Sequence, residues 1–416
     1  MNKDMTNITS HIINNDCGRK KFFDFVRSHI SEDASALRLK YHRRDTEGFY
    51  AYAITQIECR HRFGTKLAET LEHFDEFLFA DTLQGEQATS DRMARFHSRI
   101  IGDCPSLTDL TAGLGIDALH AAELCRDITA CELEPSRAEV LRYNVAGMGY
   151  GDVIKVITGD STKALREGKL SGDTVFADPA RRSTDGERVF AIEDCQPDLV
   201  ALSPLIARHF NRLIAKLSPM LDVSAVMHSL QGIRDIYVIA TPTECRELLL
   251  VSQTKSDNSM TPNIHAVTLG AYGDENFSFT ITEEASAQPT YATPVVGQWL
   301  VLPFPAVVKA GAFKLFATRH NLEKLAPNTH VYFGDTAGSG ISGQVLEIID
   351  IVPWQSKNIK RLHRQIDRAW VSCRNFPMAA AALQKKLSIK PGGELRLIAM
   401  TDRDKNPLLV VAKPIN

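Results

Sequence analysis

The sequence of 416 residues lacks several features that would assign it to a specialised class of protein. Its eight cysteines are scattered singly, with no Cys-x-x-Cys pair and no Cys/His cluster, which argues against a disulfide framework and against a zinc site. No apolar run reaches the roughly 18 residues that a membrane span requires. Residues 1–20 contain no apolar stretch of the kind found in signal peptides. We therefore expect a cytoplasmic protein with reduced thiols.

The net charge is small, but it is unevenly distributed. The whole chain carries −2, whereas residues 339–416 contain 13 Lys and Arg against 6 Asp and Glu, a charge of +7. The rest of the chain therefore carries −9. A basic C-terminal module on an acidic body is typical of a protein with a polyanionic partner.

Hydrophobic periodicity predicts helices in residues 1–95, and then alternating strands and helices in residues 96–274. One of the early helices is expected over residues 64–78, from the apolar stripe Leu67, Leu71, Phe74 and Leu78. The later alternation is typical of a doubly wound parallel α/β sheet. The strands expected in that sheet are Leu107–Leu110, Ile128–Glu132, Val153–Ile157, Thr174–Ala177, Leu213–Leu217, Asp235–Ala240 and His265–Leu269. Two small α+β modules are expected beyond it, in residues 280–338 and 339–416.

A glycine turn, Gly113-Leu114-Gly115, lies between the first predicted strand and the next helix. Glycines allow a sharp bend and bring backbone N–H groups close to a ligand at the start of that helix. Residues 113–118 satisfy G-x-G-x-x-[GA], the dinucleotide fingerprint, which would suit NAD. Asp109, four residues before Gly113, favours a different ligand, because a carboxylate repels a pyrophosphate but attracts an ammonium or sulfonium group. S-adenosylmethionine carries both cations and is the favoured cofactor.

Three further predicted strands are followed by acidic residues. Glu132 lies 19 residues after Gly113, near the roughly 20 expected for a carboxylate that binds ribose hydroxyls. Asp160 could accept the exocyclic amine of adenine, although Gly-Asp is also a common turn. Glu132 could alternatively form a structural salt bridge.

The segment after the fourth predicted strand should face the reacting group, since ligands bind beyond the carboxyl ends of strands in open α/β sheets. Asp178 could hold a nucleophilic nitrogen or act as a weak base, and Pro179 would keep the loop rigid. Arg181 or Arg182 could bind a substrate phosphate. Structural ion pairs with nearby acids are the alternative for both arginines.

Together, these strand-end residues resemble the motifs of class I S-adenosylmethionine-dependent methyltransferases. Within that superfamily, residues 178–182 resemble a bacterial group that carries a THUMP-like C-terminal domain, as do Gln87–Ser90, Lys216–Pro219 and Arg374–Pro377. The resemblance implies a Rossmann-like, seven-stranded methyltransferase domain (96–274) after an N-terminal helical domain (1–95). It also implies that the two C-terminal α+β modules are ferredoxin-like (280–338) and THUMP-like (339–416).

The resemblance also implies roles for individual residues. The methionine part of the cofactor would be lined by Asp109, Gly113 and Gly115, the ribose by Glu132 and the adenine by Asp160. Thr111 and Asp178 are further expected cofactor contacts. The residues expected in catalysis are Asp178, Pro179 and Arg181, with Arg182 contacting the substrate. Ala180 and Arg181 depart from the Pro-aromatic pair of amino-methylating nucleic-acid enzymes, whose ring stacks on the flipped base.

A basic helix is expected near the C-terminus, with Lys357, Lys360, Arg361 and Arg364 on one face. Such a face could bind phosphates and position RNA without reading its sequence, or it could simply be solvated. We therefore expect a methyltransferase acting on structured RNA, either tRNA or rRNA. Two alternatives are an RNA-binding protein that binds the cofactor without turnover, and a methyltransferase with a non-RNA acceptor. No metal and no membrane is expected to take part.

Overall fold

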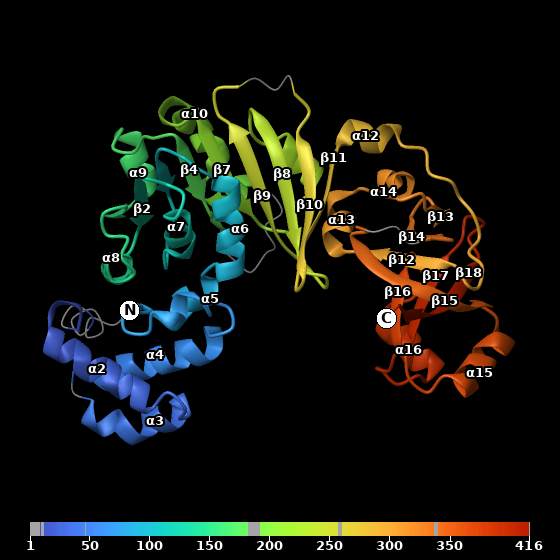
Figure 1. Cartoon of the computed structure of the whole chain (residues 1–416), viewed down its shortest axis with the longest axis horizontal. Helices are drawn as coiled ribbons and strands as arrows, with labels where there is room; N and C mark the ends of the chain where they lie inside the picture. Colours follow the sequence, from blue (N-terminus) through green and yellow to red (C-terminus); the bar gives the residue numbers. More distant parts are fainter. Residues whose placement is uncertain are drawn as a thin grey trace. The chain divides into compact units, whose positions relative to one another are not determined.

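The computed structural model describes residues 9, 12–45, 47–181, 192–256, 260–336 and 340–415 (Figure 1). The chain divides into two compact units. The first consists of Met1–Lys216, Leu230–Gly232 and Val251–Ser256, and the second consists of Leu217–Ser229, Ile233–Leu250 and Asp257–Asn416. In the parts of the chain listed above, no helix is both long enough and apolar enough to cross a membrane.

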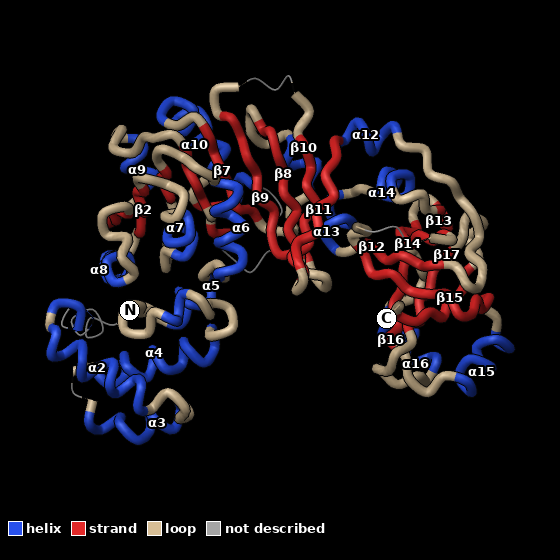
Figure 2. The backbone as a smooth tube through the Cα atoms, viewed as in Figure 1, coloured by secondary structure: helices blue, strands red, loops and turns tan. Residues whose placement is uncertain are grey.

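The first unit begins with short helices, which Figure 2 shows in blue. They are α2 (Asp16–Ser28), α3 (Ala34–Tyr41), α4 (Phe49–Phe63), α5 (Thr82–Gln87) and α6 (Asp91–Ile101), with 3-10 turns η1 (His42–Arg44) and η2 (Thr70–Glu72). Side-chain caps define several starts: Asn15 accepts a hydrogen bond from a backbone N–H at the start of α2, and Asp33 does so for α3. Phe22, Tyr52 and Ile57 form the centre of a buried core between these helices.

The prediction of a helix over residues 64–78 is wrong. The segment forms turns and η2 instead. The carboxylate of Asp91 accepts hydrogen bonds from the backbone N–H groups of Glu69 and Thr70 and from the Thr70 hydroxyl. This competing acceptor diverts N–H groups that a regular helix would use internally. Leu67 and Leu78 are nevertheless fully buried, as the apolar stripe requires.

A parallel sheet follows in the first unit, with the strand order β7-β4-β1-β2-β3. Its strands are β1 (Leu107–Asp109), β2 (Ile128–Glu132), β3 (Ile154–Thr158), β4 (Thr174–Ala177) and β7 (Arg212–Leu217). They are connected through α7 (Ile116–Ala121), α8 (Pro135–Gly147), α9 (Ser161–Arg166) and α10 (Leu199–His209). A short antiparallel pair, β5 (Ala180–Arg181) and β6 (Cys195–Gln196), and the 3-10 turn η3 (Ile192–Asp194) lie between β4 and α10. β2 and β3 are added on one side of β1, and β4 and β7 are added on the other side. Ligands bind where the strand order switches sides in this way.

The second unit contains the remaining predicted strands. β8 (Ile233–Ala240) pairs in parallel with β10 (Asn263–Gly270), which forms an antiparallel hairpin with β11 (Gly273–Thr280). All seven strands predicted for residues 96–274 are present. Four strands were not predicted: the short pair β5 and β6, together with β9 (Cys245–Gln253) and β11. The helices α11 (Val223–Met227) and α12 (Ile281–Ser286) complete this part.

The two C-terminal modules share one sheet in the second unit, drawn in red in Figure 2. Its strand order is β13-β14-β12-β15-β18-β17-β16. The strands are β12 (Trp299–Pro303), β13 (Glu323–Ala326), β14 (Thr329–Gly334), β15 (Gly343–Pro353), β16 (Trp370–Arg374), β17 (Arg396–Thr401) and β18 (Pro407–Pro414). The helices are α13 (Pro305–Ala310), α14 (Lys314–Arg319), α15 (Ser356–Gln365) and α16 (Ala380–Leu387). β12 pairs with β15, and Phe333 and Val410 lie in one buried core, so the two modules form a continuous structure. The last two strands, β17 and β18, form an antiparallel hairpin.

Candidate functional site

The carboxyl ends of the parallel strands in the first unit meet at one edge of the sheet. Asp109 and Glu132 are the last residues of β1 and β2, and Asp178 directly follows β4. Asp160 comes two residues after β3. The strands pair in parallel register, so these carboxyl groups are brought to the same edge from positions up to 69 residues apart in the chain.

The glycine turn between β1 and α7 requires glycine at both positions. Gly113 and Gly115 have φ angles of 55° and 84°, in the left-handed region that side chains disfavour. A Cβ atom on Gly115 would also overlap the Leu141 side chain of α8. A Cβ atom on Gly113 would meet only the Thr111 carbonyl oxygen, at 3.9 Å, so backbone conformation alone explains that glycine.

Asp109 is a buried carboxyl group at the start of this turn. It is 2% exposed, and its Oδ1 accepts hydrogen bonds from the Thr111 backbone N–H at 2.9 Å and from the Thr111 hydroxyl at 3.4 Å. Among the described residues, no Lys, Arg or His forms an ion pair with it. Burial, together with the nearby carboxylates of Asp117 and Asp178, raises the pKa of Asp109 to about 8, although the hydrogen bonds from Thr111 oppose this shift. A cationic ligand would relieve this unfavourable environment.

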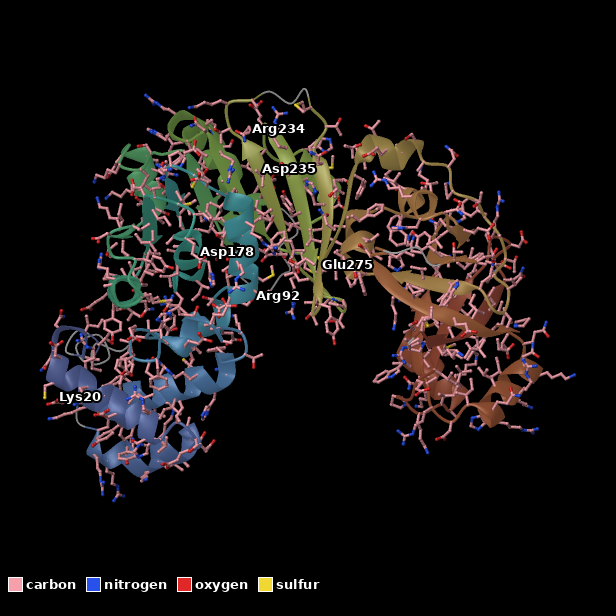
Figure 3. The ribbon with its side chains drawn as sticks, viewed as in Figure 1. Lys20, Arg92, Asp178, Arg234, Asp235 and Glu275 are labelled. Atoms are coloured by element: carbon pink, nitrogen blue, oxygen red, sulfur yellow. The ribbon has the colours of Figure 1, made fainter. Side chains whose placement is uncertain are left out.

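Thr111 connects Asp109 to the loop after β4, because its hydroxyl oxygen accepts the Asp178 backbone N–H at 2.7 Å. The Asp178 carboxylate is 38% exposed and forms an ion pair with the Lys216 ammonium, whose Nζ lies 2.7 Å from Oδ2. Lys216 comes from β7, the strand beside β4. The Asp178 backbone is thus held by Thr111, which follows β1, and the Asp178 side chain, labelled in Figure 3, is held by Lys216 of β7.

A second hydrogen-bonded chain continues from Lys216. Its ammonium donates to the Thr89 hydroxyl at 3.1 Å, and that hydroxyl donates to Asp117 Oδ2 at 2.6 Å. Asp117 Oδ1 lies 2.6 Å from Nδ1 of His97, whose side chain is fully buried. Burial disfavours the charged form of Asp117, but the charges and hydrogen bonds of His97, Lys216 and Thr89 outweigh it and lower its pKa to about 2.

Glu132 and Asp160 lie nearer the β2 and β3 end of the edge. Glu132 is 8% exposed, and its Oε1 accepts the Glu134 backbone N–H at 2.9 Å. Burial raises its pKa. Asp160 is the N-cap of α9, with Oδ1 accepting the N–H groups of Thr162 and Lys163 at 2.8 and 3.2 Å. Asp160 therefore has a structural role in this helix, as a turn residue would.

The loop after β4 is only partly covered by the described residues. Pro179 is buried and Ala180 is exposed on β5. Arg181 belongs to β5, but its side chain and the whole of Arg182 lie outside the described residues. The phosphate-binding role expected for the two arginines stays a prediction.

The basic residues predicted near the C-terminus do lie on one helix, α15, in the second unit. All four are exposed: Lys357, Lys360, Arg361 and Arg364. The opposite side of the helix places Leu362 in a buried core. Arg361 contacts Asp350 at 3.2 Å, a surface ion pair that leaves much of the positive charge uncompensated.

Several residues of the site did not emerge from the sequence. His97 and Asp117 were missed. Thr89 and Lys216 lie in Gln87–Ser90 and Lys216–Pro219, segments of the family resemblance that could border the site, but no role was predicted for either side chain. The signal for Asp117 was its position directly after the glycine turn, in the first turn of α7. The signal for Lys216 was its position near the end of a predicted strand.

Comparisons with known proteins agree with this architecture. A ferredoxin-like domain family matches residues 299–339, and a THUMP domain-like family matches residues 343–414. Uncharacterized S-adenosylmethionine-dependent methyltransferases of two Mycobacterium tuberculosis strains, CDC 1551 and H37Rv, are 25% identical to the chain over 352 residues. These residues cover 82% of this chain and 89% of each relative.

The fold of this chain is similar, over nearly its whole length, to the crystal structure of a protein from Porphyromonas gingivalis W83 that is described as a methyltransferase. It has a TM-score of 0.85 and 28% sequence identity, and the match covers 96% of this chain and 99% of that one. The chain is a homologue of S-adenosylmethionine-dependent methyltransferases. It carries a ferredoxin-like domain and a THUMP-like domain at its C-terminus.

The residues at the sheet edge fit the cofactor that this homology implies. Asp109 is a buried carboxyl group that lacks a cationic partner in the described part of the chain. S-adenosylmethionine offers an ammonium and a sulfonium. The glycine turn leaves space beside Gly113 and exposes backbone to a ligand.

Proposed function

We propose that this protein transfers the methyl group of S-adenosylmethionine to structured RNA, either tRNA or rRNA. The observation that carries the proposal is the buried carboxyl group of Asp109 beside the Gly113–Gly115 turn, in a chain homologous to such methyltransferases. A buried acid without a cation is unfavourable in the free protein, and a cationic cofactor compensates it.

The cofactor would be held by residues from three strand ends. The Asp109 carboxylate binds the ammonium group of the cofactor's methionine part. Thr111, Gly113 and Gly115 line the same part of the cofactor. Glu132 would bind the ribose through Oε2, since its Oε1 accepts the Glu134 backbone N–H. Asp160 uses Oδ1 to cap α9, so Oδ2 would accept the adenine amine.

Asp178 would orient the acceptor. The cofactor supplies an electrophilic methyl group on a sulfonium, so the protein needs chiefly to align the nucleophile with the methyl–sulfur bond. The Asp178 carboxylate would accept a hydrogen bond from an N–H group of the RNA base that receives the methyl group, while Lys216 holds the carboxylate in place. Pro179 fixes the backbone that follows, and Arg181 and Arg182 would bind substrate phosphate.

RNA is proposed as the acceptor because of the THUMP-like match and the exposed basic face of α15. The charge of residues 339–416 is +7, in contrast to −9 for the rest of the chain. Lys357, Lys360, Arg361 and Arg364 would contact phosphates, positioning the RNA without reading its bases.

The proposal is tested by following labelled methyl groups from S-adenosylmethionine into size-fractionated cellular RNA. We expect label in one RNA class with the wild-type protein and with Asp152→Asn, which changes an exposed carboxylate on a turn. Asp178→Ala should lose at least about 100-fold in transfer, by analogy with the loss of one positioned group, while cofactor affinity stays within a few fold. Equal loss of cofactor binding would refute the role given to Asp178.

A further inference from the structure

Two cysteines that are 21 residues apart in the sequence lie side by side in the first unit. Cys104, between α6 and β1, has its sulfur 2.8 Å from that of Cys125, between α7 and β2. Both are free thiols and both are buried, at 2% and 3% exposure. A disulfide bond needs a sulfur–sulfur separation of about 2.05 Å, so only a small displacement separates this pair from a covalent bond.

The contact between the two thiols favours a thiolate at Cys125. Arg212 donates to the backbone carbonyl of Ile100 at 3.1 Å, shortly before Cys104 in the chain. Its Nε is buried and has no hydrogen-bond partner among the described residues. The hydrogen bond from the Cys104 thiol lowers the pKa of Cys125 and outweighs the opposing effect of burial, and the Arg212 charge acts in the same direction. The same contact and burial raise the pKa of Cys104, so Cys125 is the thiol that ionises first.

We infer that Cys104 and Cys125 form a redox-active dithiol, which small hydroperoxides convert to a disulfide. The Cys125 thiolate attacks the hydroperoxide, the O–O bond breaks, and water or an alcohol leaves after taking up a proton. The resulting sulfenic sulfur is attacked by Cys104, the S–O bond breaks, and water leaves with the Cys104 proton. Two thiols thus lose two electrons, and one hydroperoxide is reduced.

The disulfide would close the segment 104–125, which contains Asp109 and the Gly113–Gly115 turn. A cross-link of this length restricts the unfolded chain and stabilises the fold. Oxidation would therefore link the segment before β1 to the segment after α7. This inference is independent of the proposed function, because it rests only on the two thiols and Arg212.

Cys131 provides a matched control. It is equally buried, at 2% exposure, and no second sulfur lies within hydrogen-bond distance of it in the described part of the chain. Burial raises the pKa of its thiol to about 12, so it should resist oxidation. Cys17, which is exposed, reports whether the oxidant is active.

The experiment treats the reduced, full-length protein with hydrogen peroxide, blocks remaining thiols and identifies linked peptides by mass spectrometry without reduction. We expect a Cys104–Cys125 peptide and a thermal midpoint higher by about 5 °C or more, both reversed by dithiothreitol. Cys131→Ser should behave like the wild type, whereas Cys104→Ser and Cys125→Ser should show neither change. The inference is overturned if Cys17 is oxidised while Cys104 and Cys125 remain alkylatable, or if the linked peptide forms only in denaturant.

Discussion

Cofactor binding should depend on pH through Asp109. In the free protein its pKa is about 8 because it is buried, so most of the carboxyl is protonated at pH 7. The cofactor's ammonium binds the ionised form, and binding must therefore release a proton. The carboxylate fraction rises roughly 50-fold between pH 6 and pH 8; because part of the cofactor's amino group loses its charge over the same range, the apparent affinity should rise by about 20-fold.

Above about pH 8 the affinity should level off and then fall, because the α-amino group of the cofactor has an ordinary pKa of about 7.7–8.0 and loses its charge. Asp109→Asn keeps the shape of the side chain but cannot ionise. This variant should bind more weakly at pH 8 and lack the rising limb between pH 6 and 8.

Calorimetric titration with S-adenosylhomocysteine, in buffers of different ionisation enthalpy, measures both quantities. We expect release of close to one proton at pH 7 for the wild type and about none for Asp109→Asn. An affinity that is flat from pH 6 to 8, with no proton released, would refute the role of Asp109 as the partner of the ammonium.

Four further predictions follow from the same contacts. The folded-state pKa of Asp109 is raised above its ordinary value of 3.8, so the folded protein retains a proton that the unfolded chain loses, and stability falls as the pH rises from about 4 to 8. Asp109→Asn should remove this loss of stability in thermal melts, and an unchanged pH dependence in the variant would contradict the prediction. Lys216→Met should reduce methyl transfer by at least about tenfold while S-adenosylhomocysteine affinity changes little, and normal turnover would show that the Asp178 ion pair is dispensable. Gly115→Ala should destabilise the fold by about 2–4 kcal/mol in urea denaturation, from the positive φ and the overlap with Leu141. Combined with Leu141→Ala, which removes a buried side chain, the loss should be smaller than the sum of the two single losses, and additive losses would exclude the overlap as a cause. Changing Lys357, Lys360 and Arg364 to Ala should reduce the slope of log affinity for RNA against log salt concentration by about 2. An unchanged slope would show that RNA does not bind to this face of α15.

Much of the parallel sheet could be predicted because each strand is a short apolar run separated from the next by a helical pattern. The two longer strands that were missed, β9 and β11, lack that signature. Leu248–Val251 in β9 is an unbroken apolar run, which strand and helix patterns share. β11 begins with polar residues and buries only Phe277 and Phe279.

The predicted helix over residues 64–78 failed for a related reason. Its apolar spacing describes which side chains are buried, and Leu67 and Leu78 are buried. The backbone path is decided instead by Asp91, which lies outside the segment and binds its N–H groups. Local periodicity contains no information about such a long-range acceptor.

The strand-end acids could be placed from sequence because parallel strands bring their carboxyl ends to one edge. Their partners could not. The Lys216–Asp178 and His97–Asp117 pairs join residues that are 38 and 20 positions apart, and only the strand order β7-β4-β1 and the packing of α6 beside α7 define them. The Cys104–Cys125 contact belongs to the same class, since scattered single cysteines gave no sign of it.

The most direct test of the account is a single-turnover reaction with protein in excess over labelled S-adenosylmethionine and with total cellular RNA present. We predict that label appears in tRNA or rRNA, and that the transfer is lost in Asp178→Ala but kept in Asp152→Asn. Tight binding of the cofactor without label in any RNA would contradict the proposed acceptor and favour a protein that binds the cofactor without turnover or methylates a different class of molecule.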